Sequence, residues 1–107
     1  MLEKMMHVAL LYDFYGQLLT DRQRELVELY YLNDLSLGEI AEDQSISRQA
    51  VHDQLRRAGE ALEGYEAKLG LVARHLEQQR VLQELQGCLE QGDLDRAREL
   101  VQSLVND

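Results

Sequence analysis

Apolar residues recur every three or four positions along almost the whole chain, which is the period of amphipathic helices. No proline interrupts the pattern, and Leu, Glu, Gln, Arg and Ala, which favour helices, are abundant. Polar breaks stand at Asn33-Asp34 and at Gly92-Asp93. The pattern predicts an all-α chain with helices over residues 2–18, 21–32, 36–44, 47 to 76 or beyond, a further stretch to about 89, and 94–104.

The stretch from Ser36 to Leu62 has the features of a helix-turn-helix, in which a short turn joins two helices. Ser36 and Glu39 have the spacing of a capping box, which fixes where the first helix begins. Residues 44–46 form the expected turn. Ser47 is a second N-cap, because its side-chain oxygen can accept a hydrogen bond from an amide that the next helix leaves unpaired.

The second helix of this unit has an apolar side and a polar side. Val51 and Leu55 are expected to pack against Ile40 of the first helix. The polar side carries arginine and glutamine, which can bind guanine and adenine edges in a major groove or phosphate oxygens. The candidate nucleic-acid-binding residues are Arg48, Gln49, His52, Asp53, Arg56 and Arg57. The alternative interpretation is a well-capped helical hairpin with a solvated charged face.

Apolar spacing continues beyond the helix-turn-helix into a C-terminal arm. We expect a helical bundle over residues 1–64, without a winged element, and a helical arm over 65–107 that belongs to the same compact unit or serves dimerisation. Gly59, Gly64 and Gly70 are candidate bends, because glycine in a helix costs about 1 kcal/mol relative to alanine. A free arm cannot bury its apolar residues alone, so we expect a homodimer. The alternative is a monomer whose last helix covers the arm.

The chain carries a formal net charge of −9, the wrong sign for an approach to phosphates. Within residues 47–58, however, three arginines oppose a single aspartate, so the second helix of the unit is a small basic island. A single cysteine, Cys88, suits a reducing cytosol, and the short, mixed N-terminal segment indicates neither a secretory leader nor a membrane span. We therefore expect a cytoplasmic protein that does not insert into membranes.

The sequence has no catalytic constellation, glycine-rich phosphate loop or zinc-protease motif, so an enzyme is not expected. His75 and Cys88 are a lone pair of soft ligands, too few for a metal site, and Cys88 is better explained as a small buried residue. No cofactor or metal is therefore expected. Five aromatic residues follow core spacing, so we expect them to pack in the core, although such rings can also stack on single-stranded bases. They are Tyr12, Phe14, Tyr15, Tyr30 and Tyr31.

Residues 19–62 resemble the last domain of primary sigma factors, which reads a promoter element with a helix-turn-helix. A closer resemblance is to the YlxM family, small all-helical bacterial proteins encoded beside the GTPases of the signal recognition particle. It rests on the stretches LYDFYGQLLTDRQ, YYLNDLSLGEIAE and ISRQAVHDQLRR. The resemblance covers residues 11 to about 76 well and the C-terminal arm loosely.

The resemblance implies a nucleic-acid-binding regulatory protein of the signal recognition particle pathway. Its target would be DNA or structured RNA, including the RNA of the particle. The sigma-like reading positions are Arg48, Gln49, His52, Asp53 and Arg56. The chain departs from the sigma pattern in an acidic first helix, at positions 39, 42 and 43, and in Gln44, which replaces a leucine. We therefore expect a less tightly sealed turn.

The alternative function is that of a protein–protein adaptor. In that case the helix-turn-helix is a scaffold, and acidic residues within 39–43 and 90–95 dock a basic partner such as a signal recognition particle GTPase.

Overall fold

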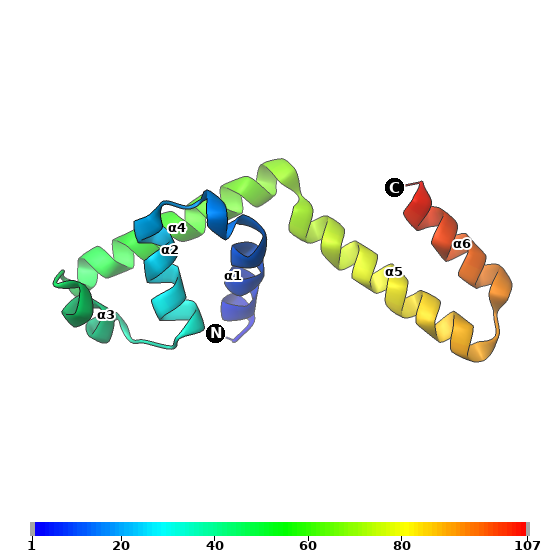
Figure 1. Ribbon diagram of the computed structural model, residues 1–107, viewed down its shortest axis with the longest axis horizontal. Coiled ribbons are helices and arrows are strands. Elements are labelled where there is room, and N and C mark those ends of the chain that lie inside the picture. Colours follow the sequence, from blue (N-terminus) through cyan, green and yellow to red (C-terminus); the bar gives the residue numbers. More distant parts are fainter. Residues whose placement is uncertain (1, 107) are drawn as a thin grey trace. The chain divides into compact units, whose positions relative to one another are not determined.

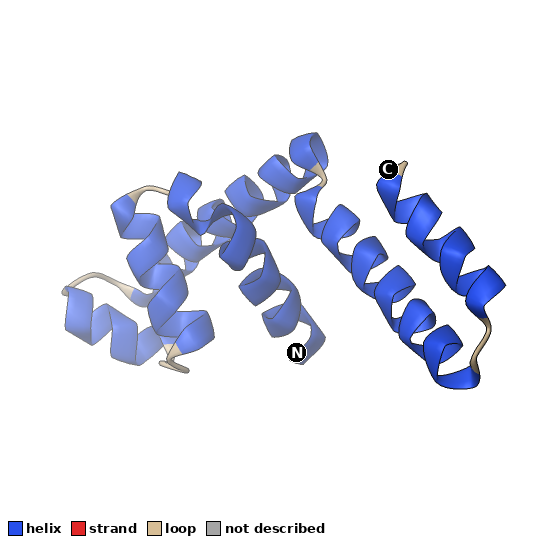
Figure 2. Cartoon of the chain, turned by 45° about the vertical axis from the view of Figure 1, so that its right-hand side comes forward, coloured by secondary structure: helices blue, strands red, loops and turns tan. Residues whose placement is uncertain are grey.

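A computed structural model describes residues 2–106, and every regular element among them is helical (Figures 1 and 2). The chain divides into two compact units, of which the first ends at Gly70 and the second begins at Leu71. The first unit contains α1 (Leu2–Tyr15), η1 (Gly16–Leu18), α2 (Asp21–Val27), η2 (Glu28–Leu32), α3 (Leu37–Gln44) and α4 (Arg48–Leu69). The second contains α5 (Leu71–Gln91) and α6 (Leu94–Val105). No helix within 2–106 is both long and apolar enough to cross a membrane.

The first unit is organised around α4, since α1, α2 and α3 all pack against it (Figure 1). The buried side of α4 carries an apolar stripe at the spacing predicted from the sequence: Val51, Leu55, Ala58 and Leu62. Burying a leucine or valine of this kind contributes about 1.5–3 kcal/mol relative to leaving it in water. The all-α helix-turn-helix architecture expected from the sequence is therefore confirmed.

The far end of α4 is joined to α1 and η1 by two tyrosine hydroxyls. The buried Tyr15 donates to Glu66 Oε1 at 2.5 Å, and Tyr65 donates to the backbone carbonyl of Leu18 at 3.2 Å. The centroids of the two tyrosine rings lie 6.0 Å apart. The first unit thus continues along α4 past residue 64, where the sequence suggested a boundary, as far as Gly70.

Side-chain caps fix the starts of α2, α3, α4 and α6, and the caps at Ser36 and Ser47 were predicted from the sequence. Thr20 with Gln23 and Ser36 with Glu39 form complete capping boxes, with hydrogen bonds of 3.0–3.1 Å. Ser47 accepts from the amide of Ala50 at 3.0 Å, and Asp93 accepts from the amide of Arg96 at 3.1 Å. These bonds satisfy amides that have no partner inside their helices.

The turn between α3 and α4 is closed by polar contacts. Ser45 ends α3 in the left-handed region, at φ 56°. Gln44, expected to seal the turn poorly, instead accepts from Arg22 Nη1 at 2.6 Å and donates to Glu25 at 3.3 Å. Hydrogen bonds to α2 therefore replace the apolar contact that a leucine would make.

The second helix changes character midway, because Glu28–Leu32 is π-helical. The amide of Asn33 bonds to the carbonyl of Glu28 at 2.9 Å, five residues back. This wider turn alters the direction of the following side chains relative to an α-helix. Leu32, expected on the buried side, is 48% exposed, and Tyr30 and Tyr31 are only partly buried.

One of the three candidate glycine bends breaks the chain. Gly70 adopts a left-handed conformation, at φ 62°, and its amide bonds to the carbonyl of Glu66 at 2.8 Å. Such a residue ends a helix. The predicted continuation of this helix to residue 76 is therefore wrong, whereas Gly59 and Gly64 lie inside an unbroken α4.

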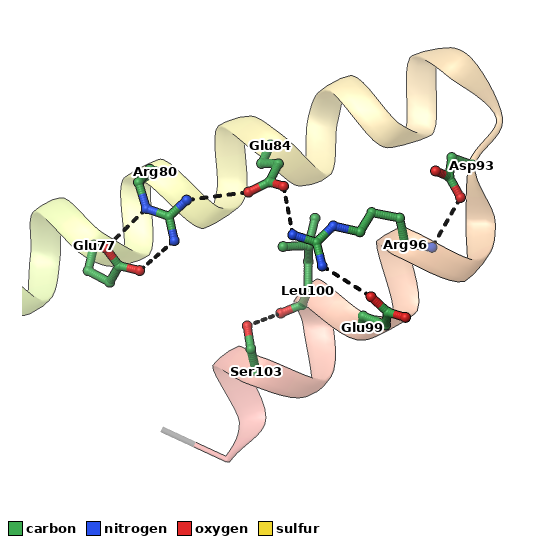
Figure 3. A network of polar contacts seen from close by, with 8 residues as sticks. All are labelled: Glu77, Arg80, Glu84, Asp93, Arg96, Glu99, Leu100 and Ser103. Atoms are coloured by element: carbon green, nitrogen blue, oxygen red, sulfur yellow. Dashed lines mark hydrogen bonds and ion pairs between the residues drawn. The ribbon is translucent and has the colours of Figure 1, made fainter.

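The second unit is an antiparallel hairpin of α5 and α6 with a small core of Val81, Cys88, Ala97 and Leu100. Leu82 and Leu89 continue the apolar spacing of the chain, but they are 45% and 56% exposed. The buried stripe is displaced by one residue, to Val81 and Cys88. On another side of the hairpin, Glu84 of α5 accepts from Arg96 of α6 at 2.9 Å, within a chain of ion pairs from Glu77 to Glu99 (Figure 3).

Two glycine-to-alanine substitutions should change stability in opposite directions. Gly64→Ala meets no atom within 4 Å and favours the helix, so the free energy of unfolding should rise by about 0.5–1 kcal/mol. Gly70→Ala forces a side chain into the left-handed region, so the free energy of unfolding should fall by about 1–2 kcal/mol. Urea denaturation of the two variants measures both changes. A loss of stability in Gly64→Ala would show that α4 is not continuous there.

Candidate nucleic-acid interface

The six candidate residues occupy the first ten positions of α4, directly after the Ser47 cap. All are accessible to solvent, with Asp53 the only one that is half-buried. Because residues four apart lie on one side of a helix, the six form two adjacent strips. One strip holds Arg48, His52 and Arg56, and the other holds Gln49, Asp53 and Arg57. The structure therefore places them on one exposed surface, which we call the α4 face.

Four of the six residues already have partners on their own helix: Gln49, His52, Asp53 and Arg56. His52 Nδ1 lies 3.9 Å from Asp53 Oδ1. Arg56 Nη1 lies 2.8 Å from Glu60 Oε1, and Gln49 Nε2 donates to Asp53 Oδ1 at 3.1 Å. An exposed ion pair of this kind is worth about 1 kcal/mol or less. A phosphate or a base edge can therefore compete for Arg56 and Gln49, at the cost of breaking these contacts.

Arg48 and Arg57 form no ion pair with any residue in the described part of the chain. They flank the α4 face on opposite sides. A planar guanidinium in this state can donate to two phosphate oxygens at once. The positive charge available for a ligand is therefore concentrated at the edges of the face, and Arg56 lies between them in its pair with Glu60.

Arg48 lies against the first turn of α3. A methyl group built at Gly38 would come within 3.0 Å of the Arg48 guanidinium, so only glycine leaves the side chain undisturbed there. The same turn holds Glu39, and the hydrogen bonds from the Ser36 backbone and side chain keep the pKa of that carboxyl below its usual value. Arg48 thus lies beside the turn of α3 that carries Gly38 and Glu39.

A groove beside the α4 face contains residues that sequence reasoning did not assign to a site. It has a volume of about 690 Å³ and is walled by α1, η2 and α4, with Leu37 of α3. Its polar lining includes Lys4, His7, Tyr30 and Tyr31, together with His52 and Arg56 of the α4 face. The spacing of Tyr30 and Tyr31 suggested core positions, and the π-helical turn that leaves them at a groove has no signal in the pattern.

Comparisons with known proteins agree with this fold. Residues 2–101 match the model of the UPF0122 family, described as "Putative helix-turn-helix protein, YlxM / p13 like". A UPF0122 protein of Symbiobacterium thermophilum is 53% identical over 97 residues, which cover 91% of each chain. Another, of Caldanaerobacter subterraneus, is 57% identical over 82 residues, 77% of this chain and 70% of the relative. A third, of Halalkalibacterium halodurans, is 44% identical over 105 residues, 97% of this chain and 96% of the relative. The chain belongs to the UPF0122 family of YlxM-like helix-turn-helix proteins.

Proposed function

We propose that this protein binds nucleic acid through the α4 face and acts as a regulator in the signal recognition particle pathway. The observation that carries the proposal is that Arg48 and Arg57, at the two edges of the α4 face, form no ion pair with any residue that the structure describes. The pathway comes from the family resemblance alone. DNA and structured RNA, including the particle RNA, are the candidate targets.

The chemistry of the face suits backbone contacts first and base contacts second. Arg48 and Arg57 can each take a phosphate without losing another partner, and Gln49 can reach a base edge once it leaves Asp53. Asp53 repels phosphate but can accept from a cytosine amine. The mixed charge of the face therefore favours a specific site over general attraction to polyanions.

We further propose that the protein is a homodimer joined through the α5–α6 hairpin. Leu82 and Leu89 directly follow the buried positions of α5, and Val101 directly follows the buried Leu100 of α6. One residue is a rotation of about 100° in the same sense on each helix. Because the two helices run antiparallel and face each other, these rotations bring the exposed residues to one side of the hairpin. A second copy would cover that side and form a four-helix bundle.

Reversal of the two unpaired arginine charges should abolish binding. For a dimer, four phosphate contacts give a dependence of log K on log salt with a slope of about −4 on a duplex. Arg48→Glu with Arg57→Glu should bring this slope close to zero and weaken binding more than tenfold. Fluorescence anisotropy with particle RNA and with a random-sequence DNA duplex measures both quantities. The matched control, Lys68→Glu with Arg74→Glu, makes the same charge change at two residues that are not part of the α4 face and should bind normally.

In the same assay, Glu60→Gln removes the partner of Arg56. Binding should strengthen severalfold, and the slope should steepen to about −5, because six arginines then contribute. If the double reversal at 48 and 57 binds as the unchanged protein does, the α4 face is not the binding surface.

The dimer is tested by a single charged substitution with a matched control. Leu82→Glu places a carboxylate on the proposed interface and should yield monomers. Leu76→Glu changes a residue that is 53% exposed on another side of α5, and it should leave the dimer intact. Sedimentation equilibrium of both variants and the unchanged protein gives the masses. A monomeric unchanged protein would refute the proposal.

A protein–protein adaptor is the second candidate function. It is favoured by the net charge of −9 and by the exposed Glu42 and Asp43 of α3 and Glu90 of α5. Such a surface suits a basic partner, here a signal recognition particle GTPase. Under this hypothesis, reversal of the charges at 42 and 43 weakens binding of the purified GTPase, and the Arg48 and Arg57 variant binds it normally.

A further inference from the structure

The groove beside the α4 face has the size and composition of a ligand site. Its volume of about 690 Å³ lies within the range of about 300–1,000 Å³ that is typical of small-molecule pockets. The buried Val8, Leu11 and Leu55 contribute apolar lining. Polar groups from α1, η2 and α4 complete its walls. Apolar lining with convergent polar groups is the usual composition of such a site.

Two neighbouring tyrosines supply aromatic surface in this groove. The rings of Tyr30 and Tyr31 meet edge to face, with centroids 4.9 Å apart and an interplanar angle of 89°. Both rings are only partly buried. Desolvation, together with the nearby Tyr30, raises the pKa of the Tyr31 hydroxyl, so it stays protonated and can donate a hydrogen bond. Exposed tyrosine faces of this kind stack on nucleic-acid bases.

The polar groups of the groove include both donors and acceptors. His7 Nε2 lies 2.6 Å from Glu63 Oε1, and Arg56 is paired with Glu60, so two carboxylates stand among the cationic groups. Carboxylates oppose a bare phosphate, but they can accept from the amino groups of a base. Lys4 and Arg56 can donate to a base edge or to the phosphate attached to it. The arrangement matches a nucleotide better than a simple anion.

The groove opens directly onto the α4 face, because His52 and Arg56 belong to both. A strand that follows the first turns of α4 therefore passes the groove. Bases in a duplex are stacked and cannot enter it, whereas loops and bulges in RNA hold unpaired bases that can turn outward. We propose that the groove receives one unpaired base of an RNA bound along the α4 face. This inference rests on the proposed nucleic-acid-binding function, and it selects structured RNA as the target.

One glycine of α4 allows the groove to be filled, and a second provides a matched control. Gly59 lines the groove, Gly64 does not, and a Cβ atom added at either position meets no atom within 4 Å. Gly59→Leu therefore places a bulky side chain in the groove, and Gly64→Leu makes the same change on the same helix outside it. Circular dichroism should show that both variants are folded, because leucine favours the helix.

The first experiment tests the groove with a nucleotide alone. Adenosine 5′-monophosphate is titrated into the full-length protein at millimolar concentration and followed by NMR. Resonances of Tyr30, Tyr31 and His52 should shift in the unchanged protein and in Gly64→Leu, but not in Gly59→Leu. An absence of shifts in the unchanged protein, or equal shifts in Gly59→Leu, overturns the inference.

The second experiment uses two RNA hairpins that differ in one bulged 2-aminopurine nucleotide. The unchanged protein and Gly64→Leu should bind the bulged hairpin about tenfold more tightly and change its fluorescence, since stacking of one base accounts for such a factor. Gly59→Leu should bind both hairpins equally. Equal binding of both hairpins by the unchanged protein overturns the groove inference and leaves the proposed function standing. If neither hairpin nor duplex DNA binds while the mononucleotide still shifts the groove resonances, the α4 face proposal fails and the groove remains a nucleotide site.

Discussion

The apolar side of α4 is the surface on which the first unit depends. Three other helices bury their own apolar residues against it, and Ala58, which is fully buried, allows close approach of the packed backbones. Because these three helices pack against α4, one side of α4 belongs to the core. The opposite side must then remain in water, so any ligand of α4 meets the helix where packing does not constrain the side chains.

Electrostatics on that outer side are balanced rather than strongly positive. The pairs of Arg56 with Glu60 and of Gln49 with Asp53 keep much of the polar surface satisfied in the free protein. Each pair is weak enough for a ligand to displace. The protein has a net charge of −9, so these internal pairs limit its general attraction to polyanions. Any choice between ligands would then depend on the geometry of individual contacts.

Features of the fold that depend on neighbouring residues were predicted well. Features that depend on contacts between distant parts of the chain were not. The caps at Thr20, Ser36 and Ser47 could be predicted because each joins a side-chain hydroxyl to the backbone amide three residues later. The choice of Gly70 over Gly59 and Gly64 as the break was not predicted, because all three glycines weaken a helix and only the backbone shows that Gly70 adopts a left-handed φ. On α5, Leu82 and Leu89 are larger apolar residues than Val81 and Cys88, so the sequence pattern favoured the leucines for the buried side. The structure instead packs Val81 and Cys88 against α6.

The candidate site shows the same division. The six residues of the α4 face follow from helix periodicity, and the Glu60 partner of Arg56 lies at a four-residue spacing that could have been recognised. The groove could not be predicted, because its walls come from four elements and depend on the π-helical turn at η2.

The contact between Gly38 and Arg48 has a consequence for how recognition can change. A small side chain at position 38 would meet the flexible end of an arginine rather than packed core atoms. The guanidinium would move, while the capping box at Ser36 and the buried stripe of α4 would keep their contacts. Gly38 is therefore a position at which the direction of the Arg48 side chain can be altered separately from the stability of the helix-turn-helix.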